Sequence, residues 1–196
     1  MEIKVATDIT AEPVSMDQIK AWMKFDLQDT SEDALIKDLI ASAREYCEKY
    51  TNLAFAQKTI DVFFQDEEII DGRMILPYGP HSSLTGLYRY DEERTETELT
   101  ENSDFYRIGN QYWELRISGQ WSDGVVLTYG YDYKARVVCG FGATGCEKLP
   151  KDLEAAIKHT VFANYRYVGD PLKYKWMMLQ VDKILDKYSR NTWLGI

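Results

Sequence analysis

Apolar residues recur at helical spacing in the first third of the chain. After the polar break at residues 26–31, one face of a helix would carry Leu35, Ile36, Leu39, Ile40, Ala43, Tyr46, Cys47 and Tyr50. Ser31, Glu32 and Asp33 stand at its start, where oxygen acceptors and negative charge suit the positive end of the helix dipole. The other face is predicted to be solvated, because it carries charges of both signs: Glu32, Lys37, Asp38, Arg44, Glu45, Glu48 and Lys49.

A shorter helix is predicted just before this one. Ser15 can cap its first turn, and Gln18 stands three residues later, as in a capping box. Ile19, Trp22 and Met23 then fall on one face. We expect this helix to run from about Met16 to Phe25.

The hydrophobic period changes to two in the middle of the chain. Ile60, Val62 and Phe64 alternate with polar neighbours, which predicts a strand. Further predicted strands, separated by glycine, proline and asparagine turns, cover residues 73–76, 83–90, 105–108, 112–117, 125–131 and 134–141. The pattern indicates antiparallel hairpins in a small sandwich or open barrel. The acidic stretch 91–104 is expected to be a solvated hairpin loop or a sheet edge.

Helical spacing returns after residue 147. Pro150 suits a first turn, and the apolar positions that follow are Leu153, Ala156, Ile157, Thr160, Val161, Asn164, Tyr165 and Val168. A last helix is expected over about 172–188, with one stripe formed by Met177, Val181, Ile184, Leu185 and Tyr188.

The order of these elements predicts an α+β fold. We expect an N-terminal helix pair, a central antiparallel β lobe, and a C-terminal helix pair with an extended tail. At 196 residues the chain is long enough for one domain, 1–196. Its expected parts are a helical part at 13–54, an inserted β lobe at 55–147, the C-terminal helices at 148–188 and the tail at 189–196.

Charge and hydropathy narrow the function classes. A formal net charge of −9 disfavours a protein that grips nucleic acid, because phosphate binding relies on a basic surface. No apolar run approaches the roughly 20 residues that span a bilayer, and the first residues lack a signal-peptide pattern. We therefore expect no membrane association and synthesis in the cytoplasm.

The groups that carry enzymatic chemistry are few. His81, in a proline-rich turn, is expected to be exposed, and His159 falls on a helix. Cys47, Cys139 and Cys146 lack metal-ligand spacing and are interpreted as reduced thiols. The glycines of residues 140–145 lack the ending of a phosphate-binding loop and indicate a strand-to-helix connection. We predict no catalytic, metal or cofactor-binding residue. The tyrosines and tryptophans leave open a carbohydrate-binding or hydrolytic module.

The ordered series of short motifs carries a family resemblance. The segments are Pro13–Ser15, Glu32–Ile36, Ile40–Asn52, Lys58–Phe64, Ile75–Pro77 with Pro80 and Ser83, Ser103–Arg107, Val125–Tyr129, Gly140–Gly142 and Leu149–Ile157. In this order they resemble the head-to-tail connector (adaptor) protein family of long-tailed double-stranded DNA phages and related gene transfer agents. The chain departs from the pattern after Tyr129, where residues 130–136 add material.

The resemblance implies a structural virion protein with no enzymatic activity. It implies a ring of identical subunits, commonly twelve, at the virion neck between the portal protein and a tail-side stopper or tail-completion protein. DNA would pass through this ring without specific binding. Another tail-completion or baseplate protein is the alternative within the same class.

The C-terminal tail is the predicted partner-binding site. Arg190, Trp193, Leu194 and Ile196 form an apolar-tipped segment that is too short to fold alone. The resemblance implies that such tails insert into the portal, and tryptophan and arginine are favoured interface anchors. The alternative is that the tail folds back on its own helices.

Overall fold

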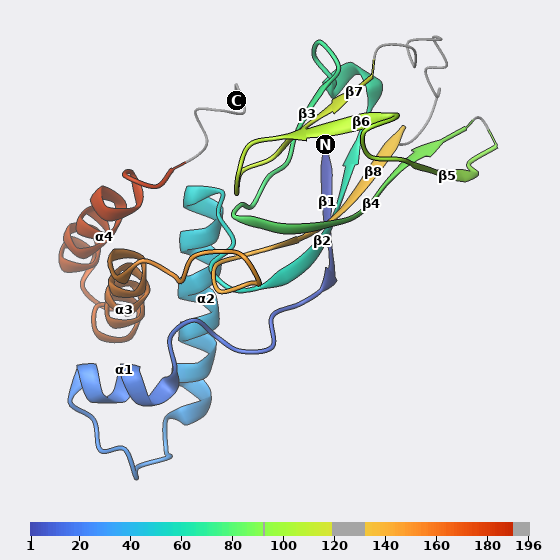
Figure 1. Ribbon diagram of the computed structural model, residues 1–196. Coiled ribbons are helices and arrows are strands. Elements are labelled where there is room, and N and C mark those ends of the chain that lie inside the picture. Colours follow the sequence, from blue (N-terminus) through green and yellow to red (C-terminus); the bar gives the residue numbers. More distant parts are fainter. Residues whose placement is uncertain (92, 119–131, 190–196) are drawn as a thin grey trace. The chain divides into compact units, whose positions relative to one another are not determined.

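The computed structural model describes residues 1–91, 93–118 and 132–189. The chain divides into two compact units. Met1–Ile9 and Gln57–Glu147 form the first, here named the β unit. Thr10–Ala56 and the chain from Lys148 onward form the second, named the helical unit (Figure 1). Helices in one unit and antiparallel strands in the other confirm the predicted α+β class.

Four helices build the helical unit: α1 (Met16–Met23), α2 (Asp33–Thr51), α3 (Lys151–Arg166) and α4 (Pro171–Leu185). Helix α3 packs against both α2 and α4 (Figure 1). The core between them consists of buried apolar side chains: Val14, Ile19, Ile36, Ile40, Ala43, Cys47, Leu153, Ala156, Ile157, Val161, Met178, Val181 and Leu185. Burial of this continuous apolar surface is the main favourable term that holds the helices together.

Local signals in the sequence fix where the helices begin and end. The capping box is present, because Ser15 Oγ accepts from the amide of Gln18 at 3.2 Å and Gln18 Oε1 accepts from the amide of Ser15 at 2.8 Å. Lys24 adopts a left-handed conformation, so α1 ends at Met23, two residues earlier than predicted. Helix α4 begins at Pro171 after Asp170, whose carboxylate accepts from the amide of Lys173 at 3.2 Å.

Two antiparallel sheets form the β unit. A five-stranded sheet has the order β1-β2-β8-β4-β5 and consists of β1 (Glu2–Thr7), β2 (Lys58–Phe64), β8 (Tyr133–Cys139), β4 (His81–Tyr90) and β5 (Glu96–Leu99). A three-stranded sheet has the order β3-β7-β6 and consists of β3 (Arg73–Ile75), β7 (Glu114–Ile117) and β6 (Phe105–Ile108). A short 3₁₀ turn covers Asp66–Glu68.

Strands at the two edges of the larger sheet differ most from the sequence prediction. Strand β1 was not predicted, because it is short and mostly exposed, with three apolar and three polar residues; its pairing with β2 places Val5 opposite Ile60. Strand β5 lies in the acidic stretch 91–104 and is an edge strand, which confirms that the stretch includes a sheet edge. The predicted strand 125–131 lies outside the described residues.

The predicted solvated face of α2 is wrong at two positions. Arg44 and Glu48 are buried, with 6% and 3% of their surface exposed, because they pair with each other inside the unit. Conversely, Leu35 and Tyr46 belong to the predicted apolar face, yet both are exposed. The helical period placed Ile36, Ile40, Ala43 and Cys47 in the core correctly, but it could not distinguish a buried ion pair from a solvated one.

Candidate interaction surfaces

Groups that could bind a metal ion are not assembled in the described part of the chain. Within residues 1–91, 93–118 and 132–189, no three His, Cys, Asp or Glu side chains cluster closely enough to hold a metal ion. No helix in the same residues is long and apolar enough to cross a membrane.

His81 is buried, contrary to the prediction that it would be exposed. Its Nδ1 accepts from the amide of Trp113 at 3.0 Å, and its Nε2 lies 2.9 Å from the carbonyl oxygen of Pro77. Burial lowers the pKa of His81 to about 4, although the bond to Pro77 works in the opposite direction. The neutral ring therefore connects the start of β4 to two loops of the β unit, and its role there is structural.

The remaining candidates for nucleophilic or acid–base chemistry have structural surroundings. The ring of His159 packs edge-on against Trp22 with ring centres 5.2 Å apart, and burial lowers the pKa of this histidine. None of the three cysteines forms a disulfide; Cys47 and Cys139 are buried and Cys146 is partly exposed. Burial raises the pKa of Cys47 to about 12, which suppresses the reactive thiolate.

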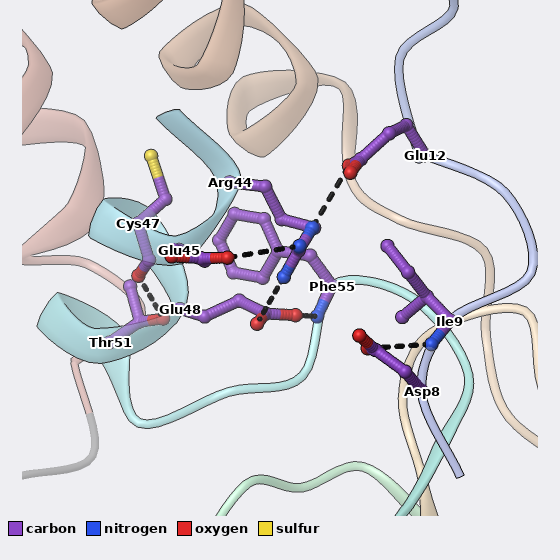
Figure 2. A network of polar contacts seen from close by, with 9 residues as sticks. All are labelled: Asp8, Ile9, Glu12, Arg44, Glu45, Cys47, Glu48, Thr51 and Phe55. Atoms are coloured by element: carbon purple, nitrogen blue, oxygen red, sulfur yellow. Dashed lines mark hydrogen bonds and ion pairs between the residues drawn. The ribbon is translucent and has the colours of Figure 1, made fainter. Parts of the chain in front are cut away.

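A buried ion-pair network stabilises the helical unit around Arg44 (Figure 2). Arg44 Nε donates to Glu12 at 2.9 Å, and its Nη1 donates to Glu48 at 3.0 Å. The second oxygen of Glu48 accepts from the amide of Phe55 at 2.7 Å. Burial alone would lower the pKa of Arg44, but the charges of Glu48 and Glu12 raise it above its usual value. The network joins α2 to the segment before α1 and to the chain that leaves α2.

Helix α4 presents a second apolar face to solvent. Leu172, Trp176 and Leu179 follow the i, i+4, i+7 spacing of one stripe, here named the α4 stripe, and they are 83%, 62% and 48% exposed. At 100° per residue this stripe lies on the side of the helix opposite Met178, Val181 and Leu185, which are buried. Contiguous exposed apolar side chains of this kind mark interaction sites.

Other exposed apolar side chains of the helical unit lie on α1, α2 and their connection. These side chains are Trp22, Leu27, Leu35 and Tyr46.

In the β unit, the surface of the three-stranded sheet combines apolar and charged side chains. Ile75 and Ile108 lie on either side of Glu114 on neighbouring strands, and Tyr106 lies opposite Arg116. Aromatic and arginine side chains are enriched at protein interfaces, so both surfaces are suited to binding partners.

The sequence analysis identified only part of this surface. The predicted portal-binding residues Arg190, Trp193, Leu194 and Ile196 lie outside the described residues. The stripe predicted for the last helix, Met177, Val181, Ile184, Leu185 and Tyr188, included two core residues and did not include the α4 stripe. The spacing of Leu172, Trp176 and Leu179 could have indicated the exposed stripe. When a helix has two apolar faces, however, its hydrophobic period does not separate them.

The described residues thus form an α+β fold that exposes apolar side chains on α1, α2 and α4. Residues 13–76 match the model of the family described as phage gp6-like head-tail connector protein. This match confirms the resemblance to head-tail connectors found in the sequence. No curated protein matches the chain in sequence.

Chains from solved particles of a gene transfer agent (GTA) share the fold. One, from the neck of an empty GTA particle computed with C6 symmetry, has a TM-score of 0.72 and 15% identity. Another, from the virion of a native GTA particle, has a TM-score of 0.72 and 16% identity. A third, from the neck of a native GTA particle computed with C12 symmetry, has a TM-score of 0.70 and 16% identity. Each alignment covers 96% of this chain and 95% of the other, so the shared fold includes both units.

Proposed function

We propose that this chain is a structural subunit of the virion neck, where it forms an adaptor between the portal of the DNA-filled head and the tail. The observation that carries the proposal is the combination of a head-tail connector match over residues 13–76 with a fold shared over 96% of the chain with GTA neck proteins. Neither observation depends on the other, because the first compares sequences and the second compares folds at low sequence identity.

The adaptor is a ring of identical subunits. The GTA necks were computed with C6 and C12 symmetry, and both are compatible with twelve copies, since a twelvefold ring also has sixfold symmetry. A closed ring of one kind of subunit requires two different, complementary faces on each copy. The helical unit offers exposed apolar side chains on more than one element, as such a ring needs.

The ring surrounds the path of the DNA and does not grip it. A net charge of −9 gives each subunit a repulsive interaction with phosphate, so that a passing duplex does not adhere. The activity is mechanical, because the subunit links neighbouring parts of the particle and no covalent bond is made or broken. The burial of His81 and Cys47, the groups best suited to such chemistry, supports this assignment.

The tail-side neighbour is a stopper or tail-completion protein, and the head-side neighbour is the portal. The tail residues Arg190, Trp193, Leu194 and Ile196 are proposed to bind the portal. Their indole, guanidinium and aliphatic groups are typical of side chains that supply much of the binding energy at interfaces.

Electron microscopy of particles tests the proposed location. Gold-labelled antibodies against this chain should bind at the head-tail junction, and averaged images of that region should show twelvefold symmetry. Labelling at the tail tip would instead identify a baseplate protein, and a sixfold ring below the neck would identify a tail component. Hydrolysis of a glycan by the purified chain, abolished by changing one acidic residue, would replace the structural assignment with an enzymatic one.

A further inference from the structure

The α4 stripe has a basic border. Lys175 lies one turn from Leu172 and one turn from Leu179, and Lys183 lies one turn beyond Leu179; both lysines are exposed. From Pro171 to Val181 the helix contains lysines and no acidic residue, in a chain with a net charge of −9. Asp170 at its start pairs with Lys173, and Asp182 and Asp186 near its end accept hydrogen bonds from Tyr46 and Tyr50 of α2, which leaves Lys175 and Lys183 as the lysines beside the stripe. The stripe is therefore an apolar surface with a positive rim, which favours a partner that is apolar and acidic.

The connection between α1 and α2 has the opposite character. Between Lys24 and Lys37 the chain carries four carboxylates and no basic residue: Asp26, Asp29, Glu32 and Asp33. Two aliphatic side chains of the same segment, Leu27 and Leu35, are each 49% exposed. We name residues 25–36 the acidic edge.

Hydrogen bonds and an ion pair hold the backbone of the acidic edge in place. Lys20 of α1 is buried, pairs with Asp33, and donates to the carbonyl oxygen of Asp29 at 2.6 Å. Asp26 and Asp29 also accept from backbone amides of the same loop, Gln28 and Ser31, at 2.9 Å each. A surface pocket of about 360 Å³ opens here. Phe25 and Ile36 line it together with polar and charged residues: Lys20, Lys24, Asp26, Asp29, Ser31 and Glu32. The segment thus presents a built surface with apolar side chains, a recess and exposed carboxylates.

We propose that the α4 stripe of one copy packs on the acidic edge of the next copy. In this contact Trp176 is the apolar anchor at the recess, and Lys175 and Lys183 face the carboxylates of Asp26, Asp29 and Glu32. The inference rests on the proposed ring and names the two surfaces that close it. Each copy carries both surfaces, so the contact is heterologous and can repeat around a ring.

Charge selects this pairing over a symmetric one. Two α4 stripes packed on each other would bring lysines together, and two acidic edges would bring carboxylates together; like charges at an interface are unfavourable. Pairing the unlike surfaces removes both repulsions. It also covers Leu172 and Trp176, which are among the most exposed large apolar side chains in the described part of the chain.

Cysteine cross-linking tests the contact directly. Trp176→Cys and Leu27→Cys would be made separately in a Cys146→Ser background, because Cys47 and Cys139 are buried. Particles that incorporate both variants, one of them carrying an affinity tag, would be treated with a short bismaleimide. We expect a cross-linked dimer of unlike copies, identified by its mass, and no dimer when either variant is present alone. Trp176→Cys with Ile70→Cys, an exposed position in the β unit, is the matched control pair.

Charge reversal supplies a second measurement. Lys175→Glu should lower incorporation of the chain into particle necks about tenfold, because it places a carboxylate against the acidic edge. Adding Asp26→Lys to the same chain should restore incorporation. A Trp176→Cys dimer formed alone would mean symmetric pairing and overturn the proposal. The proposal also fails if both cysteine variants enter the neck without cross-linking to each other, whereas absence of the chain from particles would refute the proposed function itself.

Discussion

Arg44 is a buried cation held by two carboxylates, and its contribution can be measured. Replacing Arg44 by Met removes the guanidinium but leaves the Glu48 carboxylate buried, with 4% of its side chain exposed. Breaking one side of a buried pair leaves a poorly compensated charge, so we expect the free energy of unfolding to fall by about 3 kcal/mol. Urea denaturation followed by circular dichroism provides the measurement.

A control variant shows how much an exposed partner of Arg44 contributes to the free energy of unfolding. Glu45 also pairs with Arg44, at 3.5 Å, but its side chain is 69% exposed. Glu45→Gln should therefore change stability by less than about 0.5 kcal/mol. If Arg44→Met is no more destabilising than Glu45→Gln, the network does not hold α2 in the way described.

His81 should make the β unit sensitive to acid. Its pKa is about 4 in the folded chain, against a usual value of 6.5, so between these pH values the unfolded chain binds more protons. The contribution of neutral His81 to the free energy of unfolding is therefore complete above pH 6.5. It is lost as the pH falls toward 4, and the loss reaches about 3 kcal/mol at pH 4. Protonation would also place a proton on Nδ1, which accepts from Trp113.

The measurement is the pH dependence of unfolding in the parent chain and in His81→Gln, which does not titrate. The carboxylates titrate in both proteins, so the difference between the two slopes from pH 6.5 to 4 reports on His81 alone. Parallel curves would contradict the assigned protonation state.

At the scale of elements, the start of α1 depends on one side chain. Ser15→Ala removes the hydroxyl that accepts from the amide of Gln18, and loss of such a cap destabilises a helix by about 1 kcal/mol. Ser42→Ala is the matched control, because Ser42 is an exposed residue inside α2, where alanine has the better helix propensity. Thermal unfolding should show a lower midpoint for Ser15→Ala and an unchanged or higher midpoint for Ser42→Ala.

At the scale of the whole molecule, the tail prediction separates folding from assembly. Deleting residues 193–196 removes Trp193, Leu194 and Ile196. Because the core of the helical unit is formed before residue 186, the deleted chain should fold with an unchanged circular dichroism spectrum. If the tail binds the portal, the variant should no longer be retained by portal rings in a pull-down. Normal yields of infectious particles from the deletion would refute the role of the tail.

The isolated chain is expected to be a monomer or a weak oligomer. Its long-range repulsion at a net charge of −9 opposes ring closure, and binding to a portal would align neighbouring copies and offset this repulsion. Light scattering at micromolar concentration checks this expectation, and a stable large ring of the purified chain would contradict it.

The elements that the sequence predicted well are those whose local signals agree. Helix α2 has a continuous apolar stripe, α1 has a capping box, and β2 carries apolar residues at every second position from Ile60 to Phe64, so hydrophobic spacing and capping residues identify these elements. Strand β1 carries only a short alternation, Glu2-Ile3-Lys4-Val5, in which Val5 is exposed, and it gains its structure from pairing with β2.

The sequence by itself determined the four helices, most of the described strands, the α+β order, the negative charge and the resemblance to head-tail connectors, because these depend on local spacing, composition and motif order. Tertiary structure alone decided that Arg44, Glu48 and His81 are buried and that Leu172 and Trp176 are exposed. Periodicity identifies the faces of a helix, but the number of partners that cover those faces is set by packing. For α4, packing against α3 covers one face and leaves the other available for a neighbouring subunit.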